Sequence, residues 1–151
     1  MGYDFDWVAA FTDVPFGGNG AVVVHDATGL DDATRLKVVQ ETSLVECTFL
    51  EPSDVADIRF RIYLASREVP FAGHPTLAGV ASMVHRGMVS GGALTVETKA
   101  GIIPITVSDD GDITMQQGPP VFGPVVDPDL VAAALCLSPD DIISPPQVVS
   151  T

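Results

Sequence analysis

The clearest pattern along the chain is a helical one, over residues 75 to 87. Its apolar side chains recur at the i, i+3, i+4 and i+7 spacing that marks one buried face of a helix: Leu77, Val80, Ala81 and Val84. A proline opens the segment, where a missing backbone N–H costs a helix nothing, and a glycine closes it. We therefore expect a helix here that buries this single stripe.

Segments rich in β-branched and aromatic residues predict strands on both sides of that helix. Four are expected before it, over residues 4–14, 21–25, 44–51 and 58–65. Three follow it, over residues 93–101, 102–108 and 112–117, with turns at Ala100-Gly101 and at residues 109–111. A further helix is expected over residues 31–42, where two initial aspartates suit the helix dipole.

The C-terminal part of the sequence predicts a short helix, a capped turn and the beginning of a strand. The helix is expected to start at Asp127-Pro128 and to bury one apolar face: Leu130, Ala133, Ala134 and Leu137. The capped turn covers residues 138–141, and the strand begins near residue 147. Many short strands with few helices indicate a single α+β domain over residues 1–151.

Composition changes this picture mainly by adding apolar surface that needs covering. Of the 151 residues, 46% are hydrophobic, and the mean hydropathy is +0.34. No run approaches the roughly 18 to 20 apolar residues of a membrane span, so no membrane partner is expected. The start of the chain, with two aspartates and no basic residue, does not read as a signal peptide, and we expect a cytoplasmic protein. A face covered by a partner would account for the excess apolar surface.

The charge balance is strongly acidic. Twenty acidic residues face seven basic ones, giving a net charge of −13. Phosphate backbones would repel such a chain, so nucleic acid is not an expected partner. The two cysteines, Cys47 and Cys136, match no zinc or CxxC spacing, and no metal site is predicted. We expect both to be reduced and buried as small hydrophobes.

Two residues stand out as candidates for proton transfer. On the strand over residues 44–51, alternation places Glu46 on one face with Thr48, and Cys47 on the other. Glu46 is then either a covered carboxylate with a raised pKa or an ordinary strand glutamate. His74 directly precedes the helix, where it could meet an anion or carry a proton, or simply cap the helix and pack.

Other polar residues carry weaker signals. Asn19, in the loop FGGNG, could bind a ligand or adopt a left-handed turn. That loop is neither a P-loop nor a dinucleotide fingerprint. His25 and His85 are expected to be peripheral.

Three segments in this order resemble the phenazine biosynthesis PhzF-like isomerase family: FTDVPFGGNGAVVV, LVECTFLE and RIYLASREVPFAGHPTLAG. The most specific motif is FAGHPTLAG, and the resemblance runs to the closing SPPQVVST. It implies the diaminopimelate epimerase-like fold, in which two α+β halves enclose a cleft, each a curled, mostly antiparallel sheet around a central helix. Because the family is about twice as long as this chain, we expect the N-terminal half alone, with residues 144–151 starting the crossover to a second half.

The resemblance also implies roles for individual residues. Glu46 corresponds to the family's acid/base, and His74 belongs to the Gly-His pair that lies against the substrate. The substrate-binding residues that it implies are Asn19, Gly73, Pro75 and Thr76. It implies no metal or organic cofactor.

The sequence departs from the family's usual pattern at four positions. Gly20 and Ala65 replace prolines, and Val45 replaces the serine before the catalytic glutamate. Related amino-acid racemases carry a cysteine where this chain has Ala72, which counts against a two-thiol racemase mechanism.

Several functional hypotheses follow from this resemblance. The first is an isomerase subunit that acts on a small carboxylate-bearing metabolite and pairs with a separate second half. The second is a homodimer with a Glu46 from each copy at one cleft. The others are a non-catalytic binding or regulatory module, and a truncated sequence.

Overall fold

The computed structural model describes residues 2–150, which divide into two compact units between Gln116 and Gln117. The first unit contains eight strands and two helices. In chain order they are β1 (Phe5–Ala10), β2 (Asn19–Val24), α1 (Asp32–Thr42), β3 (Glu46–Glu51), β4 (Ile58–Leu64), β5 (Glu68–Val69), α2 (Gly73–His85), β6 (Gly92–Thr98), β7 (Gly101–Val107) and β8 (Ile113–Met115).

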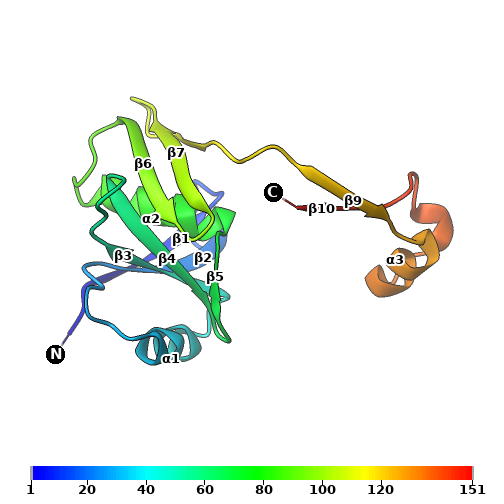
Figure 1. Ribbon diagram of the computed structural model, residues 1–151, viewed down its shortest axis with the longest axis horizontal. Coiled ribbons are helices and arrows are strands. Elements are labelled where there is room, and N and C mark those ends of the chain that lie inside the picture. Colours follow the sequence, from blue (N-terminus) through cyan, green and yellow to red (C-terminus); the bar gives the residue numbers. More distant parts are fainter. Residues whose placement is uncertain (1, 151) are drawn as a thin grey trace. The chain divides into compact units, whose positions relative to one another are not determined.

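The strands of the first unit form one sheet in the order β1-β2-β3-β4-β6-β7-β8, with β5 paired to β4 (Figure 1). Neighbouring strands are antiparallel except for two parallel pairs, β2–β3 and β4–β6. Each parallel pair is joined through a helix, α1 in the first case and α2 in the second. The predicted α+β architecture, a curled and mostly antiparallel sheet around a central helix, is confirmed.

The central helix is α2, and the sheet curls around it so that strands β1, β2, β3, β4 and β8 all contact it. Its most buried residues are Pro75, Thr76, Ala78, Gly79, Val80, Ser82 and Met83. The expected stripe was therefore wrong in part, because only Val80 of its four members is fully buried and the helix is enclosed on most sides. Gly79 allows the close approach, since a Cβ there would lie 2.5 Å from the Phe60 ring.

The other helix, α1, covers the opposite face of the sheet (Figure 1). The Asp31 carboxylate caps its start by accepting a hydrogen bond from the Thr34 amide at 2.7 Å, and Ser43 ends it in a left-handed conformation. Beneath α1 lies a second apolar cluster, which includes Cys47, Phe49 and Tyr63. The predicted helix over residues 31–42 is thus confirmed.

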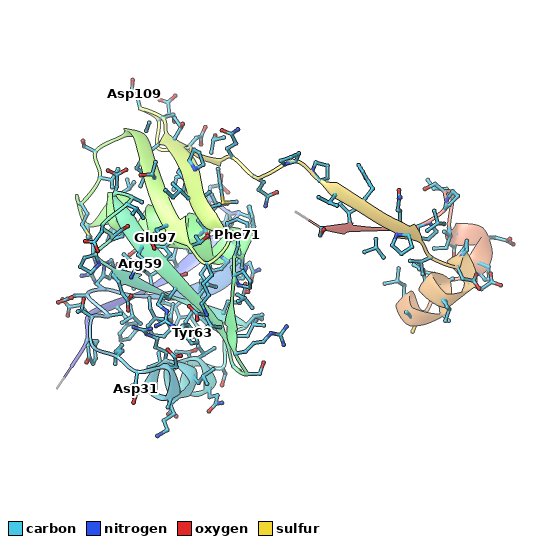
Figure 2. The ribbon with its side chains drawn as sticks, viewed as in Figure 1. Asp31, Arg59, Tyr63, Phe71, Glu97 and Asp109 are labelled. Carbon is cyan, nitrogen blue, oxygen red and sulfur yellow. The ribbon has the colours of Figure 1, made fainter. Side chains whose placement is uncertain are left out.

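An arginine from α1 is the largest side chain that is fully buried in this layer. Arg35 is 1% exposed and forms an ion pair with Glu51. It also donates to the Ala27 carbonyl at 3.3 Å, and its guanidinium lies 5.8 Å from the ring centres of Phe49 and Tyr63. Tyr63 stands between the sheet and α1 in Figure 2. Sequence patterns gave no sign that this arginine would belong to the core.

The second unit contains β9 (Val121–Val125), α3 (Pro128–Leu135), a 3-10 turn (Pro139–Asp141) and β10 (Gln147–Ser150). Strands β9 and β10 pair antiparallel. The predicted helix, capped turn and final strand are confirmed, whereas β9 was missed because VFGPV contains a glycine and a proline.

The apolar side chains of the second unit are largely exposed. Ala132 is its one buried hydrophobic residue. The predicted buried face of α3 was wrong, because Leu130, Ala133, Ala134 and Leu137 are all exposed. The other large exposed apolar residues of the unit are Val121, Phe122, Val125, Leu135, Ile143, Val148 and Val149. A two-stranded sheet with so little core is marginal by itself.

Across residues 2–150, no helix combines the length and apolarity that crossing a membrane requires.

Candidate active site

Glu46 and His74 meet in the first unit, although 27 residues separate them in the chain. Glu46 is the first residue of β3, and His74 is the second residue of α2. The His74 Nδ1 atom lies 3.1 Å from the Glu46 Oε2 atom. Their side chains are only 10% and 12% exposed, so the pair is largely withdrawn from solvent.

Strand alternation explains why Glu46 points toward α2. Leu50, on the same face, packs in the cluster that includes α2, and the Thr48 hydroxyl donates to the Pro75 carbonyl at 2.8 Å. Cys47 points the other way, into the cluster beneath α1. The predicted division of this strand into two faces is confirmed, and the face of Glu46 is the covered one.

This environment changes the acidity of Glu46. Burial raises the pKa of its carboxyl group, because the ionised form loses hydration, and the nearby His74 partly offsets the rise. A carboxyl group with a raised pKa exchanges protons more readily near neutral pH than an ordinary glutamate does. Glu46 therefore has the properties of a general acid/base.

The start of α2 adds groups that could bind an anion. No side chain among residues 2–150 caps this helix end, which begins after Ala72 in an extended conformation. Helix N-termini present free N–H groups and partial positive charge. The Nε2 atom of His74 is also buried without a hydrogen-bond partner in the described structure. A carboxylate placed here could bind the backbone N–H groups of Gly73 and His74. It would then lie next to the covered Glu46, which contacts the His74 side chain.

Asn19, implicated by the resemblance, lies at the same end of the sheet. It is exposed and is the first residue of β2, which runs parallel to β3 with Val22 beside Cys47. Alternation along β2 directs Asn19 to the face of Ala21, which packs in the α2 cluster. The structure thus brings Asn19, Glu46 and His74 to one end of one face.

Pro75 and Thr76 are buried within the helix start. The Thr76 hydroxyl donates to the Ala72 carbonyl at 2.7 Å, and the Pro75 carbonyl accepts the bond from Thr48. Their polar groups are therefore engaged inside the protein, and a role in binding substrate stays a prediction.

The two cysteines differ in their surroundings. Cys47 is buried, and burial raises the pKa of its thiol, which favours the inert protonated form. Cys136 ends α3 and is exposed, so the expectation that both cysteines are buried was wrong for Cys136. Ala72 stands at the start of α2 where related racemases carry a cysteine, so the described residues of the first unit place no thiol at that position.

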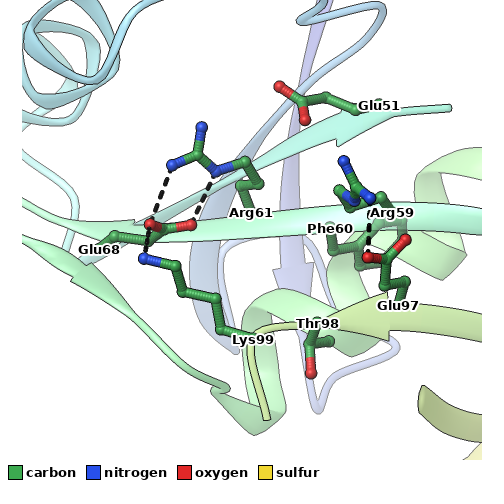
Figure 3. Close-up of a pocket in the computed structure, with 8 residues that line it drawn as sticks. All are labelled: Glu51, Arg59, Phe60, Arg61, Glu68, Glu97, Thr98 and Lys99. Atoms are coloured by element: carbon green, nitrogen blue, oxygen red, sulfur yellow. Dashed lines mark hydrogen bonds and ion pairs between the residues drawn. The ribbon is translucent and has the colours of Figure 1, made fainter. Parts of the chain in front are cut away.

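A charged pocket opens elsewhere in the first unit, on the face of the sheet that carries Arg59 and Arg61. Its volume is about 280 Å³, and Figure 3 shows its lining residues Glu51, Arg59, Phe60, Arg61, Glu68, Glu97, Thr98 and Lys99. The charges are already paired with one another. Arg61 and Lys99 both bind Glu68, and Arg59 lies 2.8 Å from Glu97. A charged ligand would have to break these pairs, so this pocket is a weaker candidate.

A partly buried polar network lies farther along α2, with His25 and Ser82 at its buried end. The His25 Nε2 atom is 2.8 Å from the Ser82 Oγ atom and 3.1 Å from Asp6 Oδ2, and Arg86 binds both Asp6 oxygens. The expectation that His25 is peripheral was wrong, because β2 carries it under α2. The network is no catalytic triad, since the serine and the aspartate approach the same ring nitrogen.

We expect Asp6→Asn to destabilise the first unit in a pH-dependent way. Hydrogen bonds from Arg86 hold the pKa of Asp6 well below its usual range, although burial opposes them. Because the folded-state pKa is lowered, this stabilisation is complete above the ordinary aspartate pKa of about 4 and is lost as pH falls toward the folded value. Urea unfolding at pH 7 should show a loss of about 1.5 to 3 kcal/mol.

Asp4→Asn is the matched control, since Asp4 is exposed and lies 3.8 Å from the same Arg86. We expect it to change the free energy of unfolding by about 0 to 1 kcal/mol. An Asp6→Asn loss of equal size at pH 3 and pH 7 would contradict the assignment.

Clusters of three or more metal-ligating side chains do not occur within residues 2–150.

Comparison with known proteins places these residues in a wider context. The profile of the PhzC-PhzF family, described as phenazine biosynthesis-like protein, matches residues 8–141. Over 154 residues the chain is 37% identical to the uncharacterized isomerase YddE of Escherichia coli K12, covering 95% of this chain and 51% of that one. Over 135 residues it is 32% identical to the trans-2,3-dihydro-3-hydroxyanthranilate isomerase of Pseudomonas aeruginosa, covering 86% and 48%.

A solved structure gives the same result for the fold. The Bacillus anthracis phenazine biosynthesis protein of the PhzF family superposes with a TM-score of 0.81 at 32% identity, covering 93% of this chain and 50% of that one. The chain therefore spans about half the length of the relatives that it matches.

Proposed function

Because this chain belongs to the phenazine biosynthesis-like PhzC-PhzF family, whose relatives include named isomerases, we propose that it is one half of an isomerase that moves a proton on a small carboxylate-bearing metabolite. The observation that carries the proposal is the covered Glu46–His74 pair at the uncapped start of α2. A raised carboxyl pKa beside an anion-binding helix end suits proton transfer on a substrate held by its carboxylate.

The proposed reaction needs one group that can both take and return a proton. Ionised Glu46 removes a proton from a substrate carbon, and the electron pair that remains spreads over the adjacent unsaturated system. Protonated Glu46 then delivers the same proton to another carbon, so that atoms and charge balance and no redox partner is needed. In this scheme His74 holds Glu46 by Nδ1, and the start of α2 binds the substrate carboxylate together with Asn19.

The second half of the active site is supplied by another polypeptide in this proposal. Proton transfer to carbon requires a cleft from which water is excluded. The chain spans about half of its relatives, and the apolar residues of the second unit are exposed. A partner that covers them would stabilise the second unit and close the cleft. Two free cysteines agree with our proposal of a cytoplasmic location.

The native mass of the protein purified from its own host tests the proposal. We expect a complex with a second polypeptide of similar size, and we expect that complex to exchange a carbon-bound hydrogen of an unsaturated carboxylate with solvent in D₂O. A homodimer with that activity would point to paired Glu46 residues at one cleft. A monomer without exchange, alone or with added candidate partners, would overturn the enzyme proposal in favour of a non-catalytic module.

A further inference from the structure

Among residues 2–150, the Glu46–His74 pair is one of two polar side-chain contacts between β3 and the first turn of α2. The other is the hydrogen bond from the Thr48 hydroxyl to the Pro75 carbonyl, at 2.8 Å. Thr48 is fully buried, and so is Pro75. The two contacts join alternate residues of the strand, 46 and 48, to consecutive residues of the helix, 74 and 75.

Glu46 and Thr48 differ in how many neighbouring strands they pair with. Thr48 lies between two neighbouring strands, beside Val23 of β2 and opposite Ile62 of β4. Glu46 is opposite Leu64 of β4, but the pairing of β3 with β2 begins only at Cys47. Thr48 is thus anchored on both sides, whereas Glu46 is at the end of the ladder.

The side chain of Thr48 is suited to transmit this rigidity. A β-branched side chain in a strand has few χ1 rotamers, so its hydroxyl has a nearly fixed direction. Pro75 has a fixed φ angle, and its place in the first turn of α2 constrains ψ, so the direction of its carbonyl is also well defined. A bond between these two stiff residues restrains the first helical turn against the strand, in addition to the packing of α2 within the sheet.

We infer that Thr48 is a positioning residue, which sets the distance between Glu46 and His74 by holding the first turn of α2 against β3. The inference rests on the proposed function only for its effect on turnover. Its structural part, that the hydroxyl maintains the Glu46–His74 contact, applies to the chain without substrate or partner.

The test is a double-mutant cycle on the full chain. The Glu46 carboxyl is titrated by carbon-13 NMR with and without His74→Gln, first with Thr48 present and then in Thr48→Val. In the parent, removing His74 should raise the apparent pKa of Glu46, because the histidine lowers it. In Thr48→Val we expect this effect of His74 to disappear. An effect of unchanged size would overturn the inference.

Thr98→Val is the matched control. Thr98 is also buried, and its hydroxyl donates to a backbone carbonyl, that of Gly101, at 2.9 Å, away from the site. Thr98→Val should lose stability, as any loss of a buried hydrogen bond does, and keep the full effect of His74 on the pKa of Glu46. If Thr48→Val does not fold, Thr48→Ala removes the hydroxyl without placing a methyl group against the carbonyl.

In the assembled enzyme, Thr48→Val should lower kcat roughly 10- to 100-fold with little change in KM, since misplacement of a catalytic group has effects of this order. Thr48→Ser, which keeps the hydroxyl, should restore most of the activity. Suppose that Thr48→Val abolishes the effect of His74 on the pKa of Glu46, but Glu46→Gln leaves the enzyme active. The proposed function would then be refuted, while the positioning role of Thr48 would stand. A full NMR effect in Thr48→Val would refute the positioning role alone.

Discussion

Glu46→Gln is expected to abolish hydrogen exchange and isomerisation by the assembled enzyme while leaving the fold intact. The amide matches the size of the carboxyl group but cannot accept and return a proton. General acid–base catalysis contributes about 10²- to 10⁴-fold, so kcat should fall by at least that order. The measurement is the rate of deuterium incorporation into substrate from D₂O, with binding followed separately.

Glu97→Gln is the control for that experiment. Glu97 lies on β6, where it pairs with Arg59. In the sheet, β4 separates β6 from β3, the strand that carries Glu46. Its replacement should leave turnover unchanged. Near-normal activity of Glu46→Gln would remove Glu46 from the mechanism.

Glu46→Gln is also expected to change how the stability of the protein depends on pH. Burial raises the folded-state pKa of Glu46, so the parent loses stability as pH rises from the ordinary glutamate value through the folded value. Glutamine does not titrate and avoids that loss. The stability of Glu46→Gln relative to the parent should therefore increase over this pH range in denaturant unfolding.

Arg35→Met is expected to cause the largest loss of stability in the first unit. It leaves the largely buried Glu51 carboxylate without the guanidinium that pairs with it, and it removes the bond to the Ala27 carbonyl. Breaking a buried ion pair in this way costs about 3 to 5 kcal/mol. Urea unfolding at pH 7 measures the change in the free energy of unfolding.

A second ion pair, Arg59–Glu97, provides the comparison. Arg59 lies 2.8 Å from Glu97 but its side chain is 39% exposed. Arg59→Met should cost about 0 to 1 kcal/mol, because an exposed ion pair gains little over hydration. Equal losses for the two variants would show that the burial of Arg35 does not matter.

Local patterns predicted the individual elements of this fold well. Strand alternation correctly assigned the two faces of β3, and the two aspartates correctly marked the start of α1. They failed where several elements surround one residue. The stripe predicted for α2 assumes one buried face, whereas a helix enclosed by a curled sheet is buried on most sides. Nothing near His25 in the sequence indicates that it will contact Ser82 directly and Arg86 through Asp6.

In the candidate active site, too, local positions could be predicted but a contact between distant residues could not. Alternation placed Glu46 on the same face as Thr48 but left open whether that face is covered, and Pro75 indicated that His74 lies at a helix start. Their contact could not be inferred, because it depends on the connection through β4 and β5 that returns the chain to the start of β3. From the sequence, only the resemblance to the isomerase family implied that Glu46 and His74 act at one site.

The unequal surroundings of the two cysteines determine how this protein responds to oxidants and alkylating reagents. Cys47 is sealed beneath α1 with a thiol that resists ionisation, whereas Cys136 is open to solvent at the end of α3. Only the ionised, accessible thiol reacts with such reagents, so modification should concentrate on Cys136. Oxidation or alkylation would then modify the second unit first and leave the Glu46–His74 pair in the first unit unchanged.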